Sequence, residues 1–145
     1  MSGLDSIPVL AGQAEGSYRT ENLRPLMLQL EQALRDLKDG GGGTVIDLGA
    51  MPFSQQDEED LRQQLGKGEV TATLDAFGPT LIQETAVPAI WLIEHKDADG
   101  RRLTLHIEVA RIPGILVTPE EDIAVGLVAL KEMNTPPDDP SERAS

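Results

Sequence analysis

The chain has 145 residues, a usual length for one domain, and its 39% of apolar residues suffice for one core although only 3% of residues are aromatic. Its formal net charge of −13 argues against binding to nucleic acid or to an anionic membrane, since both attract Lys and Arg. The chain has no cysteine, which excludes disulfides, thiolate catalysis and cysteine-held iron–sulfur clusters. An acidic surface of this kind favours docking against a basic patch on another protein.

Residues 1–21 are rich in Gly and Ser and are predicted to form a loose arm, or an edge strand around Ile7 to Leu10. The arm lacks the basic region and the long apolar run of a signal peptide, and no later stretch is apolar enough to span a membrane. We therefore expect a cytoplasmic protein.

A helix is predicted from Asn22, because apolar residues then recur at helical spacing on one side. Pro25 is tolerated because it lies in the first turn. Four glycines at 40–43 end this helix, and the apolar run 44–48 fits a short buried strand. The helical stripe consists of Leu23, Leu26, Met27, Leu30, Ala33, Leu34 and Leu37.

A second helix is predicted from Ser54, where Asp57 completes a capping pair and Leu61 and Leu65 form a buried face. After Gly66 the period changes to two, which is typical of strands. The first of these strands is expected to bury Val70, Ala72 and Leu74, and further strands are predicted over residues 81–86, 89–96 and 103–110. These segments form a four-stranded antiparallel meander, with turns at 77–79 and 97–100.

The last helix is predicted to begin with Thr118 as its N-cap and Pro119 at its first position. Its expected buried face is Ile123, Leu127, Leu130 and Met133, and the proline-rich acidic tail 135–145 is expected to be disordered. The sequence thus predicts a single α+β domain over residues 22–134. It consists of the four-stranded meander, a short extra strand and about three helices packed on one face.

The register of the last hairpin decides which way the only tryptophan points. With a four-residue loop at 97–100, Ile90 and Leu92 share a face with Leu103, Leu105 and Ile107. Trp91, Ile93 and His95 then lie on the other face, together with Arg102, Thr104 and His106. Trp91 and Ile93 would form an exposed apolar patch of the kind that marks a partner surface. The alternative is that a loop or the N-terminal arm covers Trp91.

Two polar segments have no evident local explanation. In Gln83-Glu84-Thr85, strand alternation sends Glu84 to the side opposite its two neighbours, so some polar groups need partners inside the protein. The triplet is either a hydrogen-bonded cluster that ties the sheet to a loop or a recognition site. Gly66-Lys67-Gly68-Glu69 precedes a strand instead of opening a helix, which argues against a phosphate loop and favours a tight connection with an accessible Glu69.

The sequence indicates neither a metal site nor a catalytic centre, and we expect no cofactor. In the predicted register His106 lies opposite Trp91 and His95 lies opposite Arg102, so the two imidazoles are expected to be too far apart to share an ion. No serine lies in a GxSxG turn, and neither histidine has an evident Ser and Asp companion. We predict that the protein is not an enzyme.

The segment from Gly66 to Trp91, GKGEVTATLDAFGPTLIQETAVPAIW, resembles the HupH/HyaF family of hydrogenase expression proteins. Members carry a similar Gly-x-Gly-Glu-Val segment followed by an Ile-Gln-Glu-Thr…Trp segment, and weaker similarity extends over the preceding strand and helix. Val87 and Ala89 stand where the family has phenylalanine and glycine. Family members are also commonly longer, with more than one such module. The matching residues are Gly66, Gly68, Glu69, Val70, Ile82, Gln83, Glu84, Thr85 and Trp91.

The resemblance implies a non-enzymatic accessory protein, or chaperone, for maturation of an uptake nickel–iron hydrogenase. We predict that it binds an immature hydrogenase subunit, for which the iron–sulfur small subunit is one candidate, or another maturation protein. The predicted partner-binding residues are Trp91, Gln83, Glu84, Thr85, Glu69, Gly66, Gly68 and Ile93. One alternative is a small-ligand-binding or metal-binding enzyme with Glu69 and Glu84 as acid and base. Another is a structural homodimer that pairs through the Trp91 face.

Overall fold

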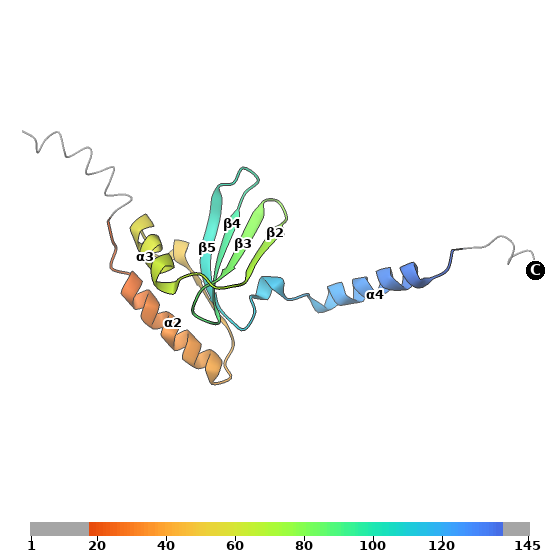
Figure 1. The fold of residues 1–145 in the computed structure, drawn as a ribbon, viewed down its shortest axis with the longest axis horizontal. Helices are drawn as coiled ribbons and strands as arrows, with labels where there is room; N and C mark the ends of the chain where they lie inside the picture. Colours follow the sequence, from red (N-terminus) through yellow and green to blue (C-terminus); the bar gives the residue numbers. More distant parts are fainter. Residues whose placement is uncertain (1–17, 138–145) are drawn as a thin grey trace, which may run out of the picture. The chain divides into compact units, whose positions relative to one another are not determined.

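The computed structural model describes residues 18–137, which divide between Pro113 and Gly114 into two compact units (Figure 1). The predicted strand around Ile7 to Leu10, most of the N-terminal arm and most of the tail lie outside the described residues. The prediction that residues 22–134 form one domain stays a prediction.

The first unit contains a five-stranded antiparallel sheet in the order β1-β5-β4-β3-β2 (Figure 1). The predicted meander is confirmed as β2 to β5, and the predicted short strand, β1, joins the sheet at its edge beside β5. The other edge, β2, is less buried than expected: Ala72 and Leu74 are half-buried, and Val70, just before the strand, is exposed. The strands are β1 (Thr44–Asp47), β2 (Thr71–Asp75), β3 (Pro79–Glu84), β4 (Ile90–Lys96) and β5 (Arg102–Val109).

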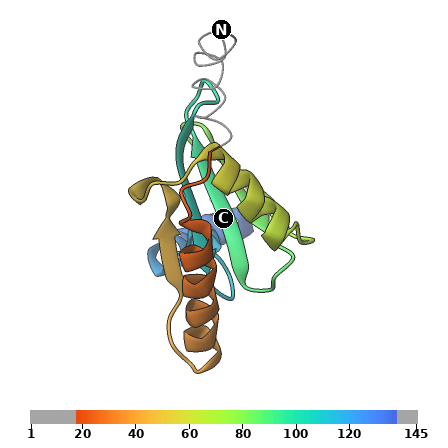
Figure 2. The same ribbon diagram turned by 90° about the vertical axis from the view of Figure 1, so that its left-hand side faces the viewer.

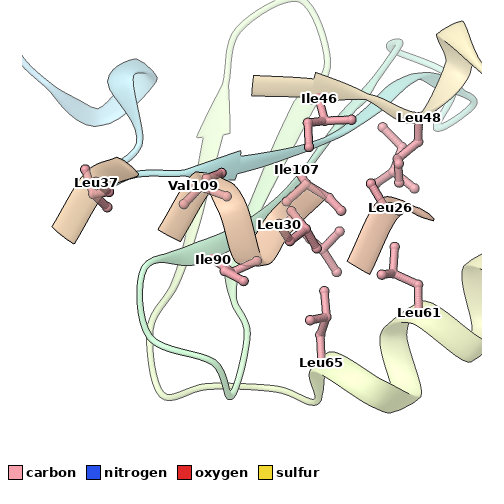
Figure 3. Close-up of a cluster of buried hydrophobic side chains, with 13 residues drawn as sticks. Leu26, Leu30, Leu37, Ile46, Leu48, Leu61, Leu65, Ile90, Ile107 and Val109 are labelled. Carbon is pink, nitrogen blue, oxygen red and sulfur yellow. The ribbon is translucent and has the colours of Figure 1, made fainter. Parts of the chain in front are cut away.

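Helices α2 (Leu23–Lys38) and α3 (Gln55–Leu65) lie on one face of this sheet (Figure 2). The predicted apolar stripes of both helices meet the sheet in one core cluster (Figure 3). A short 3₁₀ helix, η1 (Leu48–Ala50), follows β1. The buried members of the cluster are Leu26, Leu30, Ala33, Leu37, Ile46, Leu48, Leu61, Leu65, Ile90, Leu92, Leu105, Ile107 and Val109.

The hairpin of β4 and β5 keeps the predicted faces, but its register differs from the predicted one by two residues. His106 pairs with Ile93, and not with Trp91 as expected, and His95 pairs with Thr104. The reason is a wider loop at residues 97–101, with a register irregularity between His95 and Lys96. The Asp97 carboxylate holds this loop open by accepting hydrogen bonds from the backbone N–H groups of residues 99 and 101, each at 2.9 Å.

The second unit contains a short 3₁₀ helix, η2 (Gly114–Leu116), and α4 (Glu120–Asn134). The helix begins one residue later than predicted: Pro119 is its N-cap, and no side chain caps it. The prediction that Ile123, Leu127, Leu130 and Met133 form a buried face is wrong, because α4 has no buried residue. Helical periodicity alone does not supply a surface against which the stripe can pack.

The end of the N-terminal arm is fixed to the start of α3 through Asp57, which is only 1% exposed. Ser54 and Asp57 form the predicted capping box, and the Asp57 carboxylate also accepts hydrogen bonds from the backbone N–H and the hydroxyl of Thr20. Burial alone would raise the pKa of Asp57, but the hydrogen bonds from Thr20 and Ser54 outweigh it and hold this pKa below its ordinary value. Residues 18–20 are therefore part of the fold and not of a loose arm.

Ala89, directly before β4, adopts a left-handed backbone conformation with φ of 72°. This conformation costs an L-residue about 1–2 kcal/mol and costs glycine almost nothing. The position is held because the carbonyl of Ala89 accepts from the backbone N–H of Ala110 at 2.9 Å. The left-handed backbone conformation at this position is thus the one that glycine adopts most easily.

Replacing Thr20 by valine removes one donor to Asp57 and should lower the free energy of unfolding by about 1–2 kcal/mol at pH 7. A carboxylate with a depressed folded-state pKa stabilises the fold above its ordinary pKa, about 3.9, and loses this effect as pH falls through the folded-state pKa. The difference between wild type and variant should therefore shrink below pH 4. Urea unfolding at several pH values measures it, with Thr73→Val, at an exposed position, as the control. A pH-independent difference would contradict the assigned role of Asp57.

Replacing Ala89 by glycine should stabilise the first unit by about 0.5–1 kcal/mol, because the relieved backbone strain exceeds the loss of one half-buried methyl group. Thermal unfolding followed by circular dichroism measures this gain. The matched control is Ala86→Gly, at an exposed position without a positive φ, which should be neutral or destabilising. A lower melting temperature for Ala89→Gly would refute the strain at this residue.

Candidate functional site

Two segments that are distant in sequence, the loop after α3 and the end of β3, lie side by side in the first unit. Gly66 ends α3 with φ of 69°, and its backbone N–H donates to the carbonyl of Arg62 at 2.9 Å. The backbone N–H of Ala86 then donates to the carbonyl of Leu65 at 2.9 Å. The glycine motif and the Gln-Glu-Thr motif are therefore parts of one structural site.

Glu84 connects the two motifs through both its backbone and its side chain. Its Oε1 accepts hydrogen bonds from the backbone N–H groups of Glu69 at 3.0 Å and Val70 at 3.3 Å. Its own N–H donates to the carbonyl of Val70 at 2.9 Å, and its carbonyl accepts from the N–H of Gly68 at 2.8 Å. The loop between α3 and β2 has backbone N–H groups without a partner in a helix or a strand. The Glu84 carboxylate provides the acceptor for two of them.

Glycine is required at position 68 because the two motifs approach closely. A Cβ atom there would lie 2.5 Å from both Glu84 Oε1 and the carbonyl oxygen of Thr85. At Gly66 a Cβ atom would lie 2.9 Å from the Cβ of Ala86. The spacing Gly-x-Gly is therefore explained by backbone packing against β3 and not by anion binding.

Gln83 and Thr85 complete the hydrogen-bonded cluster. The Oε1 of Gln83 accepts from the hydroxyl of Thr71 at 2.8 Å, and its Nε2 donates to the carbonyl of Glu84 at 2.7 Å. Thr85 is 1% exposed, and its hydroxyl donates to the carbonyl of Val87 at 3.0 Å. These contacts match the structural role left open by the sequence, and partner binding by the same residues stays a prediction. Thr71 was not anticipated as part of the site, although the β2–β3 register places it opposite Gln83.

The predicted exposed patch of Trp91 and Ile93 does not form. Trp91 is 6% exposed, and Ile93 is 1% exposed. The indole Nε1 donates a hydrogen bond to the carbonyl of Ala110 at 3.1 Å, in the segment that follows β5. Trp91 is thus covered, as in the alternative interpretation, and its polar atom is satisfied. No sequence signal links Trp91 to the carbonyl of Ala110.

The cluster lies beside two hollows of the surface. One is a groove of about 510 Å³ between the end of α3 and the sheet, and Gln83, Gly66 and Lys67 are among its lining residues. The other is a smaller hollow of about 350 Å³, which both Glu69 and Glu84 line. Glu69 is exposed there, whereas Glu84 Oε1 is engaged by backbone amides. The pair therefore does not present two free carboxylates for acid–base catalysis.

The two histidines lie closer together than the predicted register implied, with ring centroids 5.5 Å apart. His95 Nδ1 lies 2.8 Å from the hydroxyl of Thr80. Burial and the neighbouring His95 lower the pKa of His106, although Glu108 and Asp47 act in the opposite direction. Among residues 18–137, no group of three or more His, Cys, Asp or Glu side chains is placed to hold a metal ion.

None of the helices within the described part of the chain has the length and apolar character needed to cross a membrane.

Comparison with known proteins shows similarity to hydrogenase expression proteins. A family model described as the HupH hydrogenase expression protein, C-terminal conserved region, matches residues 20–135. The hydrogenase expression/formation protein HupQ of Azotobacter chroococcum is 32% identical over 114 residues, which cover 77% of this chain and 40% of that protein. HupH of Rhizobium leguminosarum is 37% identical over 90 residues, or 61% of this chain and 31% of that protein.

A solved structure shares the fold as well as the sequence similarity. The hydrogenase expression protein HupH of Thiobacillus denitrificans is 39% identical, with a TM-score of 0.76, and the match covers 79% of this chain and 96% of that one. The chain spans about two fifths of the length of the first curated relatives that it matches. The region matched by the family model contains the whole hydrogen-bonded cluster, which extends from the loop after α3 to the end of β3. The chain belongs to the family of HupH hydrogenase expression proteins.

Proposed function

We propose that this protein is an accessory factor for maturation of an uptake nickel–iron hydrogenase and acts by binding protein, without catalysis, in the cytoplasm. The observation that carries this proposal is the family match over residues 20–135, supported by curated relatives named as hydrogenase expression/formation proteins. The partner is an immature hydrogenase subunit, with the iron–sulfur small subunit as first candidate, or another maturation protein. The net charge of −13 favours a basic patch on that partner.

The proposed contact surface is the loop after α3 with the adjoining end of β3. Glu69 is exposed on this loop. The loop backbone is held in place because Gly68 allows a close approach to β3 and Glu84 accepts a hydrogen bond from the loop. Such a loop is held before the partner arrives, so little conformational freedom is lost on binding. Trp91 contributes as an internal support, because it pairs with Glu84 across the sheet and is itself buried. Ile93 supports the same strand from within, opposite Ile82.

The binding proposal is tested by reversing the charge of Glu69. Tagged wild-type protein, isolated from cells that express the hydrogenase operon, should recover a hydrogenase subunit or another maturation protein, identified by mass spectrometry. Glu69→Lys should lower this recovery about tenfold, because it places a like charge opposite the expected basic patch. Glu59→Lys makes the same charge change at an exposed position of α3 and serves as the matched control. Equal recovery with both variants would exclude the loop from the contact.

The internal support of the loop is tested by stability. Glu84→Ala removes the acceptor of two backbone hydrogen bonds and should lower the free energy of unfolding by about 1–2 kcal/mol, whereas Glu84→Gln, which keeps an oxygen at this place, should lose less. Gly68→Ala should cost about 1–3 kcal/mol because its Cβ cannot fit without moving Glu84 or Thr85. Urea unfolding measures all three variants. If Glu84→Ala unfolds like wild type, the carboxylate does not anchor the loop.

A further inference from the structure

Strand β2 is an open edge of the sheet in the first unit. Within the described part of the chain, β2 pairs with β3 on one side and with no strand on the other. The backbone N–H of Glu84 donates to the carbonyl of Val70 at 2.9 Å, so the even-numbered residues along this strand direct their backbone groups towards β3. The N–H and C=O groups of Thr71, Thr73 and Asp75 therefore point outward.

This edge is accessible to another extended chain. The three residues whose backbone groups point outward are all exposed. Proteins commonly protect an open edge with lysine, proline, a bulge or a very short strand. β2 contains no lysine, proline or glycine, and the opposite edge strand, β1, is one residue shorter. β2 thus presents a row of backbone donors and acceptors to which a further strand can bond.

Acidic side chains at both ends of β2 oppose pairing with a second copy of the chain. Glu69 lies two residues before the strand and Asp75 is its last residue, and both are exposed. In an antiparallel pair of two β2 strands centred on Thr73, Asp75 of each copy would lie diagonal to Glu69 of the other. These like charges would repel each other. The same two carboxylates favour an added strand that has a basic residue at each end.

The side chains between these ends favour apolar residues on one face of the added strand. Val70, Ala72 and Leu74 share a face by strand alternation. Val70 is exposed, and the other two are half-buried. Apolar side chains at the neighbouring positions of an added strand would remove this surface from water. The edge therefore fits an extended segment in which apolar residues alternate with polar ones between two basic residues.

We propose that β2 binds an extended segment of the client protein as an additional strand of the sheet. The segment bonds to the outward backbone groups of β2, covers its apolar face and places basic residues beside Glu69 and Asp75. This contact is continuous with the loop after α3, which carries Glu69. The identity of the client rests on the proposed function, whereas the mode of binding rests on the geometry and charges of β2.

Thr73→Pro tests the backbone contact. Proline lacks an N–H group, and the N–H of residue 73 points away from β3, so the pairing of β2 with β3 is kept while an added strand is blocked. In the pull-down from cells that express the hydrogenase operon, Thr73→Pro should lower recovery of the client about tenfold. Thr73→Val keeps the N–H group and should recover as much client as wild type. Equal recovery with both variants would overturn strand addition, whereas failure of the wild type to recover any client would overturn the proposed function.

A synthetic peptide tests the edge of the wild-type protein without the hydrogenase operon. The peptide Lys-Val-Thr-Val-Thr-Val-Lys places valines beside the apolar face of β2 and lysines beside its two terminal carboxylates. It should slow amide hydrogen exchange at residues 71, 73 and 75 at least about tenfold, as measured by NMR, because only these amides gain an acceptor. The same peptide with both threonines N-methylated is the control, and so is the peptide with both lysines replaced by glutamate. Neither control should protect the edge. An absence of slowing at about 1 mM peptide, or equal protection by the N-methylated peptide, would overturn the proposal.

Discussion

The central strand β4 is buried on both faces, and the arrangement of the first unit depends on this constraint. Ile90 and Leu92 face α2 and α3, while Trp91 and Ile93 are buried on the other side. A slip by one residue would place Trp91 and Ile93 in the space of Ile90 and Leu92 and would separate the indole from the carbonyl of Ala110, so packing and this hydrogen bond specify the register. Because β3 and β5 both pair with β4, this register also sets the positions of Gln83, Glu84 and the segment after β5.

The polar cluster follows from the same geometry. The loop after α3 lies beside the end of β3. Some backbone N–H groups of this loop have no acceptor within a helix or a regular strand pair. The Glu84 carboxylate accepts from two of these amides, and Gly68 allows the approach. Gln83 and Thr85 satisfy further groups on both sides of Glu84. A motif that looks functional in the sequence is therefore explained in part by the need to pair buried and half-buried polar atoms. The exposed side of the same loop remains available to a partner.

Local patterns in the sequence predicted much of this fold, and long-range contacts account for the rest. The stripe of α2, the capping box of α3 and the alternation of the strands each depend on near neighbours, and each was recognised from spacing. The two-residue difference in the β4–β5 register depends on how the Asp97 side chain bonds within its loop. The burial of Trp91 depends on a carbonyl group 19 residues later. For the polar triplet, alternation showed that partners were needed but could not identify the loop amides that supply them.

The error over α4 has a different cause, because the helix itself was recognised and only its surroundings were not. A periodic apolar stripe indicates that a helix must be buried, but it does not indicate by which molecule. The proposed contact of the loop after α3 depends on charge and needs no such apolar stripe. Binding of a basic partner to the exposed Glu69 on the loop after α3 is electrostatic and weakens as salt is added.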